Sequence, residues 1–227
     1  MAIFLIAFVL LLVIGVPISI SIGASAVLGC LSLGYPLVVI GQKMVSGIDS
    51  FLLIAVPLFI LAGNLMNAGK ITEKIFDTAK ELVGWIPGGL GHANVVASII
   101  FAGMSGSAVA DAGGLGAIEM EAMKKNGYDE DFAGAVTAAS SVIGPIFPPS
   151  IPLIIYGSVA SVSVDQLFMG GVVPGLLMGV LLMVMVLYFA IVRRYERHPF
   201  RLRALIRQFL GSIPALITPV IILCGFV

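Results

Sequence analysis

Long segments without charged residues alternate along the chain with short charged clusters. Residues 1–42, 87–110 and 132–164 contain no Asp, Glu, Lys or Arg, and each is rich in aliphatic side chains. A helix needs about 20 predominantly apolar residues to cross the hydrocarbon core of a bilayer. The pattern therefore predicts an all-α integral membrane protein that crosses the bilayer several times.

The first charge-free segment is longer than one crossing requires. We expect a long first helix that ends near Pro36, then a short surface segment up to Asp49, and a second span over residues 50–69. Because polar side chains are costly in lipid, we expect Asn64 and Asn67 in the second span to face protein.

The segment over residues 70–85, KITEKIFDTAKELVGW, is amphipathic. Its apolar side chains recur at helical spacing on one face, while its charged side chains lie elsewhere. We expect a helix that lies in the membrane interface, with Trp85 as a headgroup anchor.

The motif GMSGS, residues 103–107, divides the next apolar region into two pieces, residues 90–102 and 108–118. Pieces of this length reach only about 17 to 20 Å, too short for a core of about 30 Å. We predict a re-entrant helical hairpin over residues 88–125, with Ser105 and Ser107 at its tip.

Residues 130–163 are too long for one crossing and carry a proline cluster, GPIFPPSIP, in their middle. Proline removes a backbone donor and disfavours helix in the residue before it. We predict a broken helix with an unwound middle. The hairpin and this helix together occupy residues 87–164.

The rest of the chain, residues 165–227, predicts a spanning helix over 166–192, a basic loop over 193–207 and the start of another helix. Six of the twelve Lys and Arg residues lie in that loop. The positive-inside rule places the loop in the cytoplasm, and counting crossings then places the hairpin mouth there as well. The hairpin tip and the unwound stretch are thus expected at one depth, near mid-membrane.

Two non-helical stretches at one depth are costly in lipid unless they line a cavity or bind something. Free carbonyls and Ser hydroxyls suit a small cation, and half-helix N-termini can face an anion. The residues therefore favour a Na⁺ site beside a site for an anionic solute. The alternative is that Pro and Gly only kink packed helices, which we prefer for isolated prolines such as Pro57 and Pro174.

Acidic residues of the hairpin divide into two kinds. Asp111 lies about one turn into the second arm, where it is either a coupling residue or an acid that complements a helix N-terminus. Glu119 and Glu121 lie nearer the cytoplasmic boundary, and a solvated helix end accounts for them.

Two other classes of function are open to such a chain. The run GMSG also occurs in intramembrane serine proteases, which need a general base near the serine. His92 lies before the serine on the same hairpin and His198 lies in the basic loop, so we expect no enzyme. The basic loop has spans on both sides and is no nucleic-acid site. A channel with a re-entrant filter loop stays the alternative.

Four stretches carry a resemblance to a known family: PLFILAGNLM, GMSGSAVADAGGLG, NGYDEDFAGAVTAASSVIGPIFPPSIPLIIYG and GGVVPGLLMG. Together they resemble the large membrane subunit of tripartite ATP-independent periplasmic (TRAP) transporters over essentially the whole chain. The resemblance implies the first half of an inverted-repeat, elevator-type fold in the bacterial inner membrane, with scaffold helices over residues 1–86 and transport-domain elements over residues 87–164. It also implies Na⁺-coupled uptake of an organic acid, of the C4-dicarboxylate or sialic-acid type.

The resemblance also implies partners and residue roles. A periplasmic substrate-binding protein would deliver the solute, and a small four-helix membrane subunit would accompany the chain. The first Na⁺ site would be supplied by Ser105, Gly106, Ser107, Gly144, Phe147 and Pro149, with no other metal expected, and Ser150 and Ser107 would contact substrate. Since the family's large subunit is about twice as long, we expect a partial chain that does not transport alone.

Overall fold

The computed structural model describes residues 2–49, 51–195, 205–213 and 217. The described residues form helices, turns and bends, with no strand among them, which confirms the all-α prediction. The chain divides into two compact units, residues 1–51 and 52–227, and each unit is treated by itself.

In the first unit, two helices, α1 (Ala2–Val13) and α2 (Ile18–Ser32), lie where one long helix was predicted, and α3 (Val38–Ile48) follows them. The long first helix is wrong because the chain turns at Gly15, whose φ of +88° is left-handed, and Pro17 precedes α2. Helices α1 and α2 pack together, with Phe4 of α1 against Gly29 of α2. Helix α3 replaces most of the short surface segment.

The second unit begins with α4 (Phe51–Ala68) and α5 (Ile71–Val83). Helix α5 is amphipathic as predicted, but its apolar face packs into the protein core. Ile75 and Ala79 are fully buried, mainly against α6. Trp85 is 53% exposed, so its role as a headgroup anchor stays a prediction.

The predicted hairpin is present as two antiparallel arms. The first arm is α6 (Gly89–Ser105), and the second runs through α7 (Ala108–Ala110), the π-helical turn η1 (Asp111–Leu115) and α8 (Gly116–Lys125). The break falls at Gly106–Ser107, so α6 has 17 residues and reaches about 25 Å, longer than expected. The arrangement of this hairpin in a membrane stays a prediction.

The predicted broken helix is also present. Helix α9 (Glu130–Ser141) ends in a series of tight turns, and α10 (Ile151–Ala160) begins after them. Residues 142–150 are therefore the unwound stretch, with a cis peptide bond between Pro148 and Pro149. Helix α11 (Val164–Arg193) follows as the predicted spanning helix.

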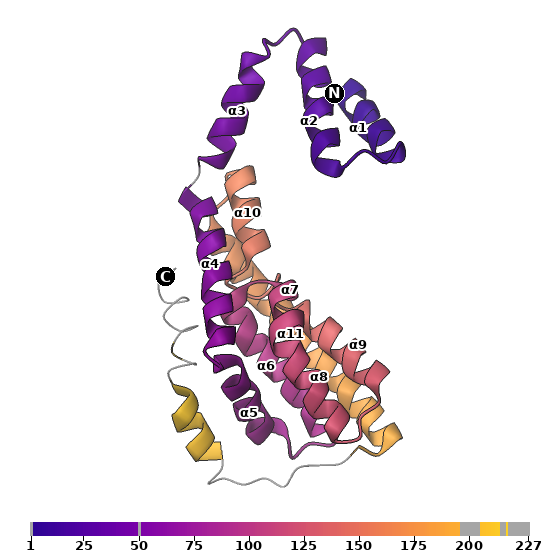
Figure 1. Cartoon of the computed structure of the whole chain (residues 1–227), viewed down its shortest axis with the longest axis vertical. Coiled ribbons are helices and arrows are strands. Elements are labelled where there is room, and N and C mark those ends of the chain that lie inside the picture. The colour runs from indigo at the N-terminus through magenta and orange to yellow at the C-terminus, as the bar shows by residue number, and fades with distance from the viewer. Residues whose placement is uncertain (1, 50, 196–204, 214–216, 218–227) are drawn as a thin grey trace. The chain divides into compact units, whose positions relative to one another are not determined.

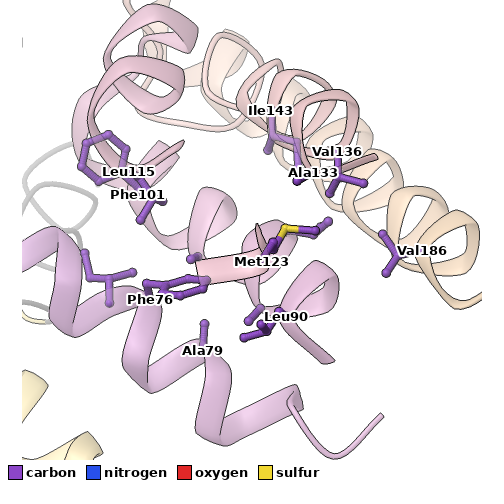
Figure 2. Packing of buried hydrophobic residues seen from close by; sticks show 14 of the residues in the cluster. Phe76, Ala79, Leu90, Phe101, Leu115, Met123, Ala133, Val136, Ile143 and Val186 are labelled. Atoms are coloured by element: carbon purple, nitrogen blue, oxygen red, sulfur yellow. The ribbon is translucent and has the colours of Figure 1, made fainter. Parts of the chain in front are cut away.

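One hydrophobic core joins α5, the hairpin, α9 and α11 (Figure 2). Phe101, Leu115, Met123, Val136 and Val186 are each fully buried in it, and they come from five different elements. In Figure 1 the hairpin arms, α9 and α11 run alongside one another within this unit. The core thus fixes the hairpin against the broken helix.

Among the helices that the structure describes, α11 alone is by itself long and apolar enough to cross a membrane. Residues 205–213 are helical and lie against α5, where the Ser212 and Thr78 hydroxyls are 2.7 Å apart. Most of the predicted basic loop and of the helix predicted after Phe209 lie outside the described residues.

Candidate functional site

The hairpin tip and the unwound stretch contact each other through their backbones. The Ile151 N–H donates to the Gly106 carbonyl oxygen at 3.3 Å. A Cβ atom at Gly106 would lie 2.6 Å from the Pro149 carbonyl oxygen, and the φ of Gly106 is +57°. Only glycine fits this approach without strain. The structure thus brings together the two segments that the sequence singled out.

The other predicted residues of the tip lie at the same junction. A Cβ atom at Gly144 would lie 3.3 Å from the Ser107 carbonyl carbon and 3.5 Å from the Ala108 nitrogen. The Ser107 hydroxyl caps the second arm by accepting from the Ala110 N–H at 3.3 Å. Gly144 and Ser107 are therefore neighbours although 37 positions separate them in the sequence.

Ser150 caps the second half of the broken helix. Its hydroxyl accepts from the Leu153 N–H at 3.3 Å and donates to the Pro145 carbonyl oxygen at 2.6 Å. This pair of bonds closes the unwound stretch into a loop and starts α10. Two capped helix N-termini, at Ser107 and Ser150, thus begin at the junction.

Ser105 differs from the two capping serines. Its side chain is 1% exposed, and its hydroxyl makes no hydrogen bond to any described residue. It lines a cavity of about 450 Å³ between α4 and the hairpin, together with Asn64, Asn67 and Ser107. A buried hydroxyl without a partner is costly, so this atom has capacity for a ligand.

The predicted placement of the two asparagines of α4 is met in part. Asn64 is exposed but lines the cavity. Asn67 accepts from the Thr72 hydroxyl at 2.5 Å, and its amide lies so close to Gly114 that a Cβ atom there would be 2.3 Å from Nδ2. Asn67 therefore faces protein and packs α4 onto η1.

Phe147 points away from the hairpin tip, toward α11. A Cβ atom at Gly175 would lie 3.0 Å from the Phe147 ring, and one at Gly171 would lie 2.4 Å from the Ile146 carbonyl oxygen. Sequence reasoning did not identify this packing of the unwound stretch against Gly171 and Gly175 of α11. The signal was the spacing of Gly171, Gly175 and Gly179, since small residues four apart allow close packing in membrane helices.

A buried hydrogen-bond network lies between α6 and α9, and sequence reasoning missed it too. The Asn94 amide donates to the Thr137 hydroxyl at 2.8 Å, and the Ser140 hydroxyl donates to the Asn94 carbonyl oxygen at 2.7 Å. The Ser98 hydroxyl donates to Ser140 at 3.1 Å. These bonds satisfy polar groups in the core and set the register between the two helices.

The sequence-based interpretation of Glu119 is wrong. Its side chain is 0% exposed and makes no hydrogen bond to a described residue, because α8 turns it inward with Leu115 and Met123. Glu121 is solvated as expected and pairs with Lys125 at 2.6 Å. Asp111 is buried and also makes no hydrogen bond among the described residues. Whether Asp111 is structural or coupling stays open.

The hairpin mouth and the end of α11 lie at the same end of this unit. Asp129 accepts from Arg193 and, at 2.8 Å, from the Tyr195 hydroxyl. These hydrogen bonds, from Tyr195 first and then from Arg193, lower the pKa of Asp129. The Arg193 guanidinium also lies 5.6 Å from the centre of the Phe132 ring. The start of α9 is thus tied to the end of α11.

A Ser–His pair is not formed by the described residues. Ser105 makes no hydrogen bond there, and both ring nitrogens of the buried His92 also lack one. His198 lies outside the described residues.

The comparison with known families decides the class of the protein. The sequence model of the family "Tripartite ATP-independent periplasmic transporter, DctM component" matches residues 5–227. The chain belongs to this family. It is therefore an integral membrane protein of a permease family and not an enzyme, which confirms both predictions and leaves the number of crossings a prediction.

Individual relatives are transporter permeases named for different substrates. The chain is 51% identical to the sialic acid TRAP transporter large permease protein SiaM of Vibrio cholerae, over 81% of this chain and 43% of that protein. It is 51% identical to the sialic acid permease SiaT of Haemophilus influenzae, over 81% and 30%. It is 41% identical to the 2,3-diketo-L-gulonate permease YiaN of Escherichia coli, over 83% and 44%. The chain thus matches less than half the length of each.

Proposed function

We propose that this chain forms part of the membrane subunit of a Na⁺-coupled importer of an organic acid, with the first Na⁺ site at the hairpin tip. The observation that carries the proposal is the backbone contact between Gly106 and Ile151, beside the unpartnered Ser105 hydroxyl. Carbonyl and hydroxyl oxygens at such a junction are the ligands that a small cation uses in transporters with broken helices.

Each predicted ligand has a proposed role in this site. Gly106, Gly144, Phe147 and Pro149 would contribute backbone oxygens, since a glycine or a proline offers no other donor and the Phe147 side chain is turned toward α11. Ser105 would contribute its hydroxyl. Ser107 and Ser150 begin two helices there, so the positive ends of both point toward an anion bound beside the cation.

The substrate proposal rests on the relatives. Two of them at 51% identity are named sialic acid permeases, and others are named for C4-dicarboxylate, isethionate and 2,3-diketo-L-gulonate. All of these solutes are organic anions. We therefore propose sialic-acid-type uptake, with delivery by a periplasmic binding protein and with a small four-helix membrane subunit in the complex.

The proposed mechanism is of the elevator type, with several crossings of the bacterial inner membrane. The hairpin and broken helix would move as a transport domain, because one core and one backbone hydrogen bond join them. Of the predicted scaffold, residues 1–86, helices α1, α2 and α3 would stay in place, whereas α5 shares the core of the hairpin and would move with it. A channel is disfavoured because the relatives are named as transporter permeases.

The test uses the full-length complex in proteoliposomes. Uptake of sialic acid should be lost when choline or K⁺ replaces Na⁺, and equal uptake without Na⁺ would remove the sodium assignment. Ser105→Phe and Ser107→Phe should each abolish uptake while membrane insertion is retained. Ser46→Phe is the control, because the Ser46 hydroxyl is exposed and bonds only weakly within α3, at 3.4 Å. Normal uptake in both hairpin variants would exclude the tip from the mechanism.

A further inference from the structure

Two buried carboxylates of the hairpin are not used by the proposed sodium site. Asp111 is 1% exposed and Glu119 is 0% exposed. None of their four oxygens makes a hydrogen bond to a described residue. Among the described residues, no nitrogen of a Lys, Arg or His side chain lies within 4.0 Å of either carboxylate. Glu119 therefore lacks the partners that normally compensate a buried charge.

The π-helical turn η1 explains why both carboxylates face inward. In a continuous α-helix, at about 100° per residue, residues eight apart would lie about 80° from each other around the axis. The wider turn over residues 111–115 takes up most of this offset. Asp111 and Glu119 consequently lie on one buried face, and like charges on one face would repel each other.

No other titratable group among the described residues forms an ion pair that would compensate the charge of Glu119. Helix α8 packs against α6, η1 and α9. On α8 itself, Lys125 pairs with Glu121 and Lys124 pairs with Glu130 of α9, all of them exposed. The remaining titratable groups on the packed elements are His92 on α6, Asp111 on η1 and the exposed Asp131 on α9, and His92 forms no ion pair with a described residue.

A metal ion or a partner protein is also a poor source of compensation. A metal cation needs several oxygen ligands around the carboxylate, and none of the described residues supplies a polar contact to Glu119. Because the side chain is already enclosed by its own unit, another chain or a further segment could reach it only after the hairpin opened. Protonation is the remaining way to remove the charge, and a neutral buried group costs far less than an ionised one.

We propose that Glu119 binds a proton and is neutral in the folded protein at neutral pH. The hairpin then carries a proton-binding site in its interior, separate from the sodium site at its tip. The proton removes one of two like charges and lets α8 pack against α6 and α9. Asp111 is the second buried carboxyl group, nearer the tip.

The experiment is infrared spectroscopy of the full-length complex at pH 7, which separates the C=O band of a protonated carboxylic acid from carboxylate bands. A wild-type minus Glu119→Gln difference spectrum should contain a carboxylic-acid band that shifts in D₂O. Glu121→Gln is the matched control two residues away, and its difference spectrum should lack that band. Glu119→Met is the second neutral variant, and it should lose the same band.

Three results would overturn the proposal. One is an acid region that is identical in the wild type and both Glu119 variants. Another is a carboxylic-acid band that remains in both Glu119 variants but is lost in Asp111→Asn, which would assign the proton to Asp111. The third is a Glu119 acid band that disappears when Na⁺ replaces choline, which would make a metal cation the compensating charge. None of these readouts uses transport, so they are independent of the proposed function.

Discussion

Replacement of Gly106 by Ala tests whether the backbone junction at the hairpin tip is as close as the structure has it. The added Cβ would lie 2.6 Å from the Pro149 carbonyl oxygen and 3.2 Å from the Ser150 Cα, both on backbone that has little freedom to move. The φ of +57° adds a left-handed conformation, which costs a non-glycine residue about 1–2 kcal/mol.

The expected size of the effect follows from these contacts. Relief of the clash requires the tip to move away from Ile151 and to lose its hydrogen bond, which costs about 1 kcal/mol. Together with the left-handed backbone, the loss of stability is about 2–3 kcal/mol. The sodium site should be lost as well, since its two halves would no longer meet.

Gly113→Ala is the matched control on the same hairpin. Nothing lies within 4 Å of a Cβ atom at Gly113, and the residue is helical. Alanine there should be neutral or stabilising by about 0.5–1 kcal/mol. Thermal unfolding of the purified full-length complex measures both variants, and Na⁺-dependent uptake in proteoliposomes gives the functional readout. If Gly106→Ala has the same unfolding temperature and the same Na⁺-dependent uptake as Gly113→Ala, the hairpin tip and the unwound stretch do not approach as closely as described.

Two further predictions concern the packing of α11. Gly175→Ala should destabilise the complex by about 1–3 kcal/mol through overpacking against the unwound stretch. Gly170→Ala is the control and should not destabilise it, because a Cβ atom there would meet open space. Equal unfolding temperatures of the two variants would refute the close packing of Phe147 against Gly175. Asp129→Asn should lower the unfolding temperature at neutral pH. Because the pKa of Asp129 is lowered in the fold, the stabilisation from its carboxylate is fully present above the ordinary pKa of an Asp side chain and is lost as the pH falls through the lower folded pKa. The difference between wild type and variant should therefore vanish below that range, and a difference that grows in acid would contradict the assignment.

The proline cluster and the GMSGS motif could be interpreted from sequence because their effects are local. Four prolines within residues 145–152 remove donors wherever the chain goes, so the break between α9 and α10 was predictable. The hairpin turn was placed a few residues early, because Gly103 and Met104 continue α6 in the structure. A glycine inside an apolar run does not by itself end a helix.

Other features depend on tertiary contacts that no local pattern contains. Gly15 and Pro17 mark the turn between α1 and α2, but an apolar sequence with a glycine and a proline is also compatible with one kinked helix, and the packing of α1 on α2 distinguishes the two. Glu119 looked solvated because charged residues follow it. A four-residue spacing from Leu115 through Glu119 to Met123 was the available signal, since all three are fully buried on one stripe.

The attachment of α11 at two places has a consequence for the setting in which the protein works. Near its start, Gly171 and Gly175 hold the unwound stretch, and at its end Arg193 holds Asp129. The helix has 30 residues and is about 45 Å long, so we expect it to tilt if it crosses a hydrocarbon core of about 30 Å. A change in bilayer thickness would alter that tilt and act at once on the start and on the unwound middle of the broken helix. Lipid chain length is thus a variable that reaches the candidate ion site without any ligand binding there.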